Sequence, residues 1–124
     1  MAPAILYMMT KSWAKKNGAY MWLFERMLPG DDKGAWHSSD LWYWFGTLKN
    51  CWRPMEKTDY IISDNMTTYL CNFVKNGSPN GEGIPKWDKC KNAKDVMSFG
   101  DCISSKGKMK MLIYNTLTNK PVGE

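Results

Sequence analysis

The chain has a single histidine, His37, in a short polar loop that runs directly into an aromatic segment. The surrounding stretch, from Gly34 to Gly46, reads GAWHSSDLWYWFG. An imidazole can accept and return a proton near neutral pH, so a histidine on a loop is a candidate general base. A lone histidine beside Trp36 is also a common structural residue, and the local sequence leaves both interpretations open.

Hydrolysis of an ester by a serine enzyme would need further groups beside that histidine. These are a serine on a strained strand-to-helix elbow, an orienting carboxylate and an oxyanion hole. The elbow signature Gly-x-Ser-x-Gly does not occur; the nearest string, Gly77 to Gly81, has a proline after its serine. An HGGG-type oxyanion motif is absent as well. The sequence therefore holds a candidate base without the nucleophile that such a base would activate.

The residues around His37 resemble the histidine loop of type-B carboxylesterases, the serine-esterase family that includes the cholinesterases. In that loop small residues precede the triad histidine, an acidic residue follows it, and an aromatic-rich helix ends in Phe-Gly. These places fall here on Gly34 and Ala35, His37, Asp40, and Trp42 to Gly46. The resemblance implies that His37 descends from the general base of a serine triad.

A second block, Ser63 to Asn80, is similar to a helix of the same family that ends in Phe, Gly and the pair Pro-Asn. The matching residues are Ser63, Met66, Tyr69, Asn72, Phe73, Gly77, Pro79, Asn80 and, shortly afterwards, Trp87. Both blocks keep the order and approximate spacing of the family, so together they are specific at family level.

The resemblance implies an α/β fold: the C-terminal part of an α/β-hydrolase, with a helix, a buried strand, the histidine loop, helices and short C-terminal strands. The triad of this fold runs serine, acid, histidine along the chain, so a C-terminal piece keeps only the base. We expect residues 1–124 to be a single partial domain, inactive alone, whose small-molecule ester substrate binds only to the intact enzyme. Asp40 is interpreted as a helix cap, with a carboxylate close to His37 as the alternative.

Composition restricts the partners. The chain has 124 residues, a net charge of +5 and 44% hydrophobic residues, which is typical of a globular domain. Its lysines are scattered and only Arg26 and Arg53 are arginines, so we expect a solvated surface rather than a nucleic-acid interface. No apolar run approaches the ~20 residues of a membrane span, and residues 1–16 lack the features of a signal peptide. We expect no membrane partner, and the localisation stays open.

The four cysteines, Cys51, Cys71, Cys90 and Cys102, could form two disulfides or none. Cys71 lies in a helical pattern, so we expect it to be a buried free thiol. One histidine and widely spaced cysteines match no zinc signature, and no cofactor is expected.

Periodicity predicts the elements that would position His37. The expected elements are an amphipathic helix at 1–16, a strand at 19–25 buried on both faces, a linker at 47–58 with Trp52 in the core, a helix at 59–76 ended by Gly77, and strands at 96–99 and 109–114 joined by a loop at 104–107. Ile62, Met66, Tyr69, Leu70 and Phe73 should form the apolar side of the helix at 59–76.

Two other classes of function remain open. The seven tryptophans could form a ligand-stacking surface, although Trp22, Trp42 and Trp44 have apolar neighbours that favour core packing. A chain with exposed strand edges or apolar helix faces could instead form a homo-oligomer.

Overall fold

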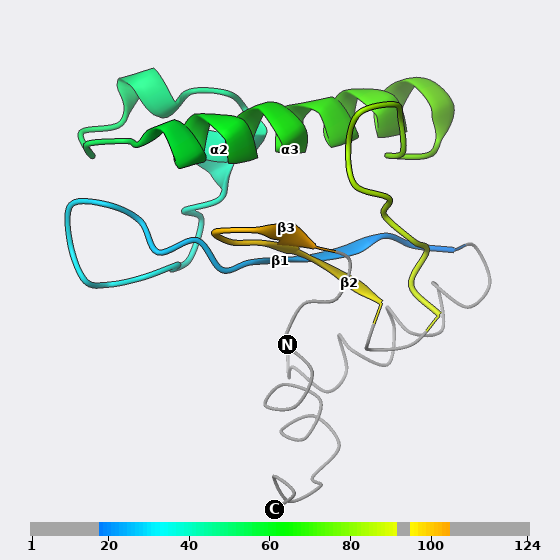
Figure 1. The fold of residues 1–124 in the computed structure, drawn as a ribbon, viewed down its shortest axis with the longest axis horizontal. Coiled ribbons are helices and arrows are strands. Elements are labelled where there is room, and N and C mark those ends of the chain that lie inside the picture. Colours follow the sequence, from blue (N-terminus) through cyan, green and yellow to red (C-terminus); the bar gives the residue numbers. More distant parts are fainter. Residues whose placement is uncertain (1–17, 92–94, 105–124) are drawn as a thin grey trace, which may run out of the picture. The chain divides into compact units, whose positions relative to one another are not determined.

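The computed structural model describes residues 18–91 and 95–104. Its elements are β1 (Met21–Phe24), α2 (Leu41–Trp44), η1 (Leu48–Asn50), α3 (Lys57–Asn76), β2 (Val96–Phe99) and β3 (Ile103–Ser104). The strands form one sheet in the order β1-β2-β3, with β1 parallel to β2 (Figure 1). The helix predicted at 1–16 and the strand predicted at 109–114 lie outside the described residues.

The described residues divide into two compact units. One holds residues 18–23, 88–91, 95–98 and 104; the other holds 24–87 and 99–103 and includes His37. In the first unit, the Cys90 backbone N–H donates to the Ala19 carbonyl at 2.7 Å, and the Cys90 thiol donates to the Met21 sulfur at 3.3 Å.

Helix α3 is the longest element within the described residues, with 20 residues, and its two ends have recognisable signals. At its start the Glu56 backbone N–H donates to the Asp59 carboxylate at 2.7 Å, as in a capping box. At its end Gly77 adopts the left-handed conformation (φ 70°), and its N–H donates to the Phe73 carbonyl at 2.8 Å. The helix predicted at 59–76 is confirmed and begins two residues earlier, at Lys57.

The core of the second unit is built from aromatic rings. Phe99 is fully buried, and its ring lies 5.6, 5.8 and 5.7 Å from the rings of Trp44, Tyr69 and Trp87. These edge-on arrangements suit the ring quadrupoles and contribute about 0.5–1.5 kcal/mol per pair beyond the area they bury. Ile62 and Met66 of α3 are buried as predicted.

Two predictions about the strands need correction. Strand β1 exists, but it is not buried on both faces: Trp22 is 46% exposed. Within the described residues β1 is an edge strand with β2 as its neighbour, whereas the apolar run predicts a central strand covered on both sides. The strand predicted at 96–99 is confirmed as β2, but Ser104 belongs to β3 rather than to a connecting loop.

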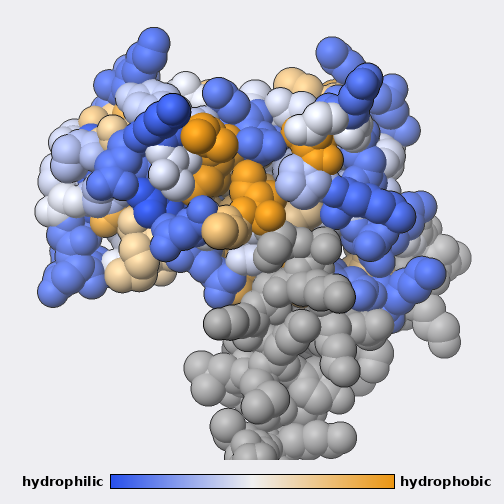
Figure 2. Space-filling view, viewed as in Figure 1, coloured by the Kyte–Doolittle hydropathy of each residue, from blue (hydrophilic) through white to orange (hydrophobic). Residues whose placement is uncertain are grey.

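Several side chains predicted to be buried are exposed. Trp52 is 72% exposed and lies against the guanidinium of Arg53, whose carbon is 4.7 Å from the ring centroid. Trp42, Leu70 and Phe73 are also exposed. Figure 2 shows hydrophobic side chains gathered along α3. Helical periodicity gives the side on which apolar residues lie, but not how far along the helix that side is covered.

The four cysteines are free, so neither disulfide forms. Cys71 is exposed, contrary to the prediction of a buried thiol, because it lies on the outer side of the C-terminal half of α3. No helix in the described part of the chain is long and apolar enough to cross a membrane.

Candidate active site around His37

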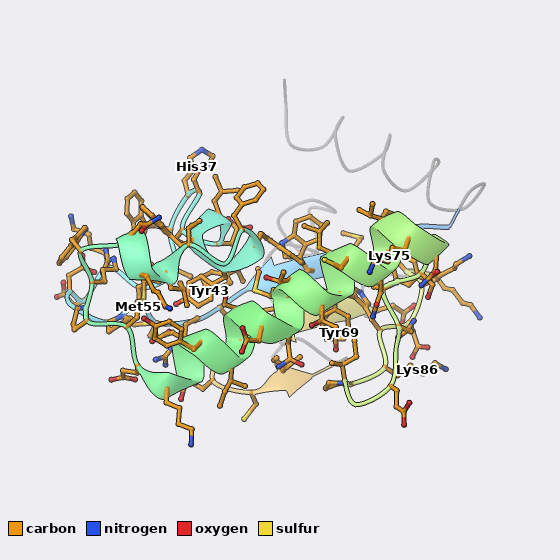
Figure 3. The ribbon with its side chains drawn as sticks, turned by 90° about the horizontal axis from the view of Figure 1, so that it is seen from above. His37, Tyr43, Met55, Tyr69, Lys75 and Lys86 are labelled. Carbon is orange, nitrogen blue, oxygen red and sulfur yellow. The ribbon has the colours of Figure 1, made fainter. Side chains whose placement is uncertain are left out.

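His37 lies in the segment that connects β1 to α2, in a turn at residues 37–40. The turn is closed by Ser39, whose N–H and hydroxyl both donate to the Trp36 carbonyl, at 3.1 and 2.7 Å. The imidazole is exposed, and in Figure 3 it projects away from α3. A loop after a sheet strand is the place that the resemblance predicts for the histidine.

The residue after the histidine has an unusual backbone. Ser38 has a φ of 64°, in the left-handed region, and among the described residues it is the non-glycine residue with a positive φ. This conformation costs a residue with a side chain about 1–2 kcal/mol. The turn around Ser39 supplies hydrogen bonds that hold Ser38 in it, so the histidine is presented on a strained but bonded turn.

Asp40 occupies the N-cap position of α2, but its carboxylate makes no capping hydrogen bond. Its Oδ2 instead accepts a hydrogen bond from the Trp44 indole N–H at 3.2 Å. The prediction of a capping side chain therefore needs correction: Asp40 already has helical dihedrals (φ −70°, ψ −19°), and a capping side chain needs an extended backbone. In the described part of the chain no hydrogen bond joins Asp40 to His37.

Arg26, at the start of the same connecting segment, is buried and bonds three carboxylates. Its Nε and one terminal nitrogen donate to Asp59 at 2.8 and 3.3 Å. Its terminal nitrogens also donate to Glu56 at 2.8 Å and to Asp101 at 2.6 Å. The hydrogen bond to Asp59 holds the pKa of Arg26 above its ordinary value. Arg26 thus joins the entry of the His37 segment to α3 and to the β2–β3 turn.

Asp59 is the fully buried member of this group. Burial alone would raise the pKa of its carboxyl, but the hydrogen bonds from Arg26 and Tyr43 outweigh burial and lower that pKa. Asp59 is therefore a carboxylate at neutral pH, and its charge is compensated inside the protein.

Tyr43 of α2 reaches the same carboxylate from the other end of the segment. Its hydroxyl donates to Asp59 Oδ1 at 2.7 Å, and burial followed by that bond raises the pKa of Tyr43. The Tyr43 carbonyl accepts hydrogen bonds from the hydroxyls of Ser63 at 2.8 Å and Thr67 at 3.4 Å. Figure 3 shows Tyr43 between α2 and α3.

Arg53, the second arginine, also bonds the His37 segment. Its guanidinium donates to the Pro29 carbonyl at 2.9 Å and to Asp31 Oδ2 at 2.7 Å. The hydrogen bond from Arg53 lowers the pKa of Asp31. Both arginines of the chain are thus used to hold the segment that presents His37.

The chemistry of the site is limited to what one exposed imidazole can do. Ser39 is buried and donates its hydroxyl to Trp36, so it is not placed as a nucleophile. Among the described residues no group of three His, Cys, Asp or Glu side chains could hold a metal ion.

A sequence model of the carboxylesterase family matches residues 2–115. The chain belongs to the carboxylesterase family. Within this family it is similar to carboxylesterase 1C of Rattus norvegicus, with 29% identity over 76 residues. Among solved structures it is similar to an esterase from the anaerobe Clostridium hathewayi that can hydrolyse aliphatic aromatic polyesters, with a TM-score of 0.68 and 23% identity. That likeness shows a partial α/β fold, so the predictions of family and fold class are confirmed.

The matches cover most of this chain but little of the length of its relatives. The rat protein aligns with 60% of this chain and 13% of its own length. The Clostridium hathewayi esterase aligns with 86% of this chain and 21% of its own. The chain therefore spans about a fifth of that esterase and less of the rat enzyme.

The sequence did not reveal the buried group formed by Arg26, Tyr43 and Asp59. Its members are 16 to 33 residues apart along the chain, and local periodicity carries no information on such contacts. One signal was present: Glu56 and Asp59 have the i, i+3 spacing of an acidic capping box at the start of α3.

Proposed function

We propose that this chain is the C-terminal portion of a serine carboxylesterase and that His37 is the general base of that enzyme. The observation that carries the proposal is the place of His37, exposed on the segment between β1 and α2 in a chain that matches the family over residues 2–115. The small share of its relatives that the chain covers supports its being a portion of a larger fold.

In the intact enzyme His37 would accept the proton of the serine hydroxyl as it attacks the ester carbonyl. It would then give this proton to the departing alkoxide, and repeat both steps when water releases the acyl group. Because the serine precedes the histidine in the chain order of this fold, serine, acid and oxyanion donors come from the part that the chain does not include. The substrate is a small-molecule carboxylic ester.

The first test is hydrolysis of p-nitrophenyl acetate by the purified chain. An exposed imidazole reacts slowly with this ester by itself, so the reference is an equal concentration of N-acetylhistidine. We expect no turnover above that reference. Faster turnover that His37→Ala abolishes would show that the chain carries its own nucleophile and would refute the assignment to a portion of the enzyme.

The second test restores the missing part. The chain replaces the matching 21% of the Clostridium hathewayi esterase, and the chimera is treated with a fluorophosphonate that labels activated serines. We expect labelling that His37→Ala slows strongly and that Asp64→Asn, an exposed acid on α3, leaves unchanged. Equal rates of labelling with and without the His37→Ala substitution would show that His37 is not the general base.

A second candidate function is assembly through apolar surface, which is favoured by the exposed residues beside His37. Trp36, Leu41 and Phe45 are 55%, 47% and 69% exposed. Such a surface commonly pairs with another chain. Light scattering at several protein concentrations tests this: a mass that rises with concentration and falls after Phe45→Ser supports a homo-oligomer, and a constant monomer mass excludes it.

A further inference from the structure

The segment from Glu25 to Asp40 carries His37, and its two ends converge on one atom. Arg26, at the entry, donates its Nε hydrogen to Asp59 Oδ1 at 2.8 Å. Tyr43, just beyond the exit, donates its hydroxyl hydrogen to the same Oδ1 at 2.7 Å. A single buried oxygen therefore bonds a residue at the entry of the loop and a residue beyond its exit.

The carboxylate itself is held rigidly. Asp59 lies in the first turn of α3, and its Oδ2 accepts hydrogen bonds from the Glu56 backbone N–H at 2.7 Å and from Arg26 at 3.3 Å. Its side chain is completely buried. A side chain with both oxygens bonded and no access to water has little freedom, so it serves as a fixed reference for whatever it binds.

The exit is held by α3 a second time. The Ser63 hydroxyl donates to the Tyr43 carbonyl at 2.8 Å, one helical turn along from Asp59. Tyr43 is thus bonded at its backbone and at its ring to the same helix. Between the two anchored ends, Arg53 holds Pro29 and Asp31, and residues 35–38 are exposed. The end anchors therefore act together with the Arg53 bonds and the Ser39 turn in deciding where the imidazole lies.

We infer that Asp59, acting through Arg26 and Tyr43, is a positioning residue for His37. This inference rests on the proposed role of His37 as a general base. It does not make Asp59 the acid of the triad, because in the described residues Asp59 bonds Arg26, Tyr43 and the Glu56 backbone rather than the imidazole. Its role is to hold both ends of the loop at a fixed separation, since a base must stay within hydrogen-bond reach of the proton that it takes.

The test uses the fact that His37 is the only histidine of the chain. In protein labelled with ¹³C,¹⁵N-histidine, NMR spectra report one imidazole without overlap. Tyr43→Phe removes the hydroxyl that bonds Asp59 and keeps the ring and its packing against Phe24 (ring centroids 4.8 Å apart). The matched control is Tyr69→Phe, which removes another buried tyrosine hydroxyl, bonded to the Pro85 carbonyl at 2.6 Å.

We expect Tyr43→Phe to shift the His37 ring resonances and to speed hydrogen exchange of the Ser39 amide, which donates to the Trp36 carbonyl, by about tenfold or more. Tyr69→Phe should leave both unchanged. Unchanged His37 signals in Tyr43→Phe would overturn the inference. Equal changes in both variants would overturn it too, because they would show a general loss of stability. Should Tyr43→Phe not fold, Ser63→Ala, which frees the Tyr43 carbonyl, is compared with the same control.

The NMR readout is independent of esterase activity, so the two proposals fail separately. Suppose that His37→Ala abolishes labelling of the chimera but Tyr43→Phe leaves the NMR signals unchanged. His37 would then remain the proposed base, and Asp59 would no longer be its positioning residue. In the same chimera Tyr43→Phe should lower kcat and leave KM unchanged, because a displaced base affects the chemical step rather than ester binding.

Discussion

Replacing Asp59 by asparagine tests the energetics of the buried group most sharply. The substitution keeps the size of the side chain but removes the charge that accepts two hydrogen bonds from Arg26 and one from Tyr43. It also places an amide N–H opposite one of these donors. Breaking one side of a buried ion pair costs about 3–5 kcal/mol.

The structure places the expected loss at the lower end of that range. Arg26 keeps hydrogen bonds to Glu56 and Asp101, so its charge is not left unpaired. Those two side chains are mostly exposed and therefore compensate only in part. We expect Asp59→Asn to lower the free energy of unfolding by about 3 kcal/mol, which is a large fraction of the 5–15 kcal/mol typical of a domain.

The assay is urea unfolding followed by tryptophan fluorescence at several pH values. Because the folded-state pKa of Asp59 lies below its unfolded value of about 3.9, its contribution is fully present above that pH. It is lost as the pH falls through the lower, folded-state pKa. The stability of the original chain should therefore decline more steeply in acid than that of Asp59→Asn, and the two should converge.

The control is Asp64→Asn, the same chemical change at an exposed position of α3. Surface substitutions of this kind change stability by less than about 0.5 kcal/mol. A loss below about 1 kcal/mol for Asp59→Asn, or parallel pH curves for the original chain and the variant, would refute the assignment of a buried, compensated carboxylate.

Three further predictions concern other parts of the second unit. Burial raises the pKa of Tyr69 to about 12. In an alkaline titration followed by absorbance at 295 nm, Tyr69→Phe should therefore remove a signal that appears late, at high pH, and leave the signals that appear at lower pH. Loss of a signal at lower pH would contradict the burial of Tyr69. Gly77→Ala should lower the free energy of unfolding by about 1 kcal/mol because residue 77 has a left-handed backbone. Steric contact adds nothing to this loss, since no atom lies within 4 Å of the added methyl group. An unchanged urea midpoint would contradict this prediction. Phe99→Ala should lower the free energy of unfolding by about 3–5 kcal/mol, because three aromatic rings lose the ring that they all contact. A loss as small as that of a surface substitution would exclude a core role for Phe99.

The parts of the fold that the sequence predicts are those with local signals. Helix α3 has a capping pattern at its start, an apolar side and a glycine at its end, and each of these acts within a few residues. The sequence predicts the turn at His37 between a strand and a helix because polar residues separate two apolar runs. Strand β2 follows from a short run of apolar residues.

The parts that the sequence does not predict depend on distant contacts. Arg26 bonds Asp101, 75 residues further along the chain, and no local pattern marks that pair. The exposure of Trp52 and Phe73 has the same origin: an apolar side chain is buried only where another part of the chain covers it. Asp40 shows a different limit, since residue type indicates a cap, but backbone dihedrals decide whether the side chain can make the bond.

The proposed chemistry depends on His37 as a proton acceptor, and one ratio tests it directly. This is the ratio of kcat/KM for ester hydrolysis by the chimera with the Clostridium hathewayi esterase, before and after His37→Ala. General-base catalysis contributes about 10²–10⁴-fold, so we predict a loss of at least about 100-fold. An unchanged kcat/KM, or a folded chimera without any hydrolysis before the substitution, would contradict the account.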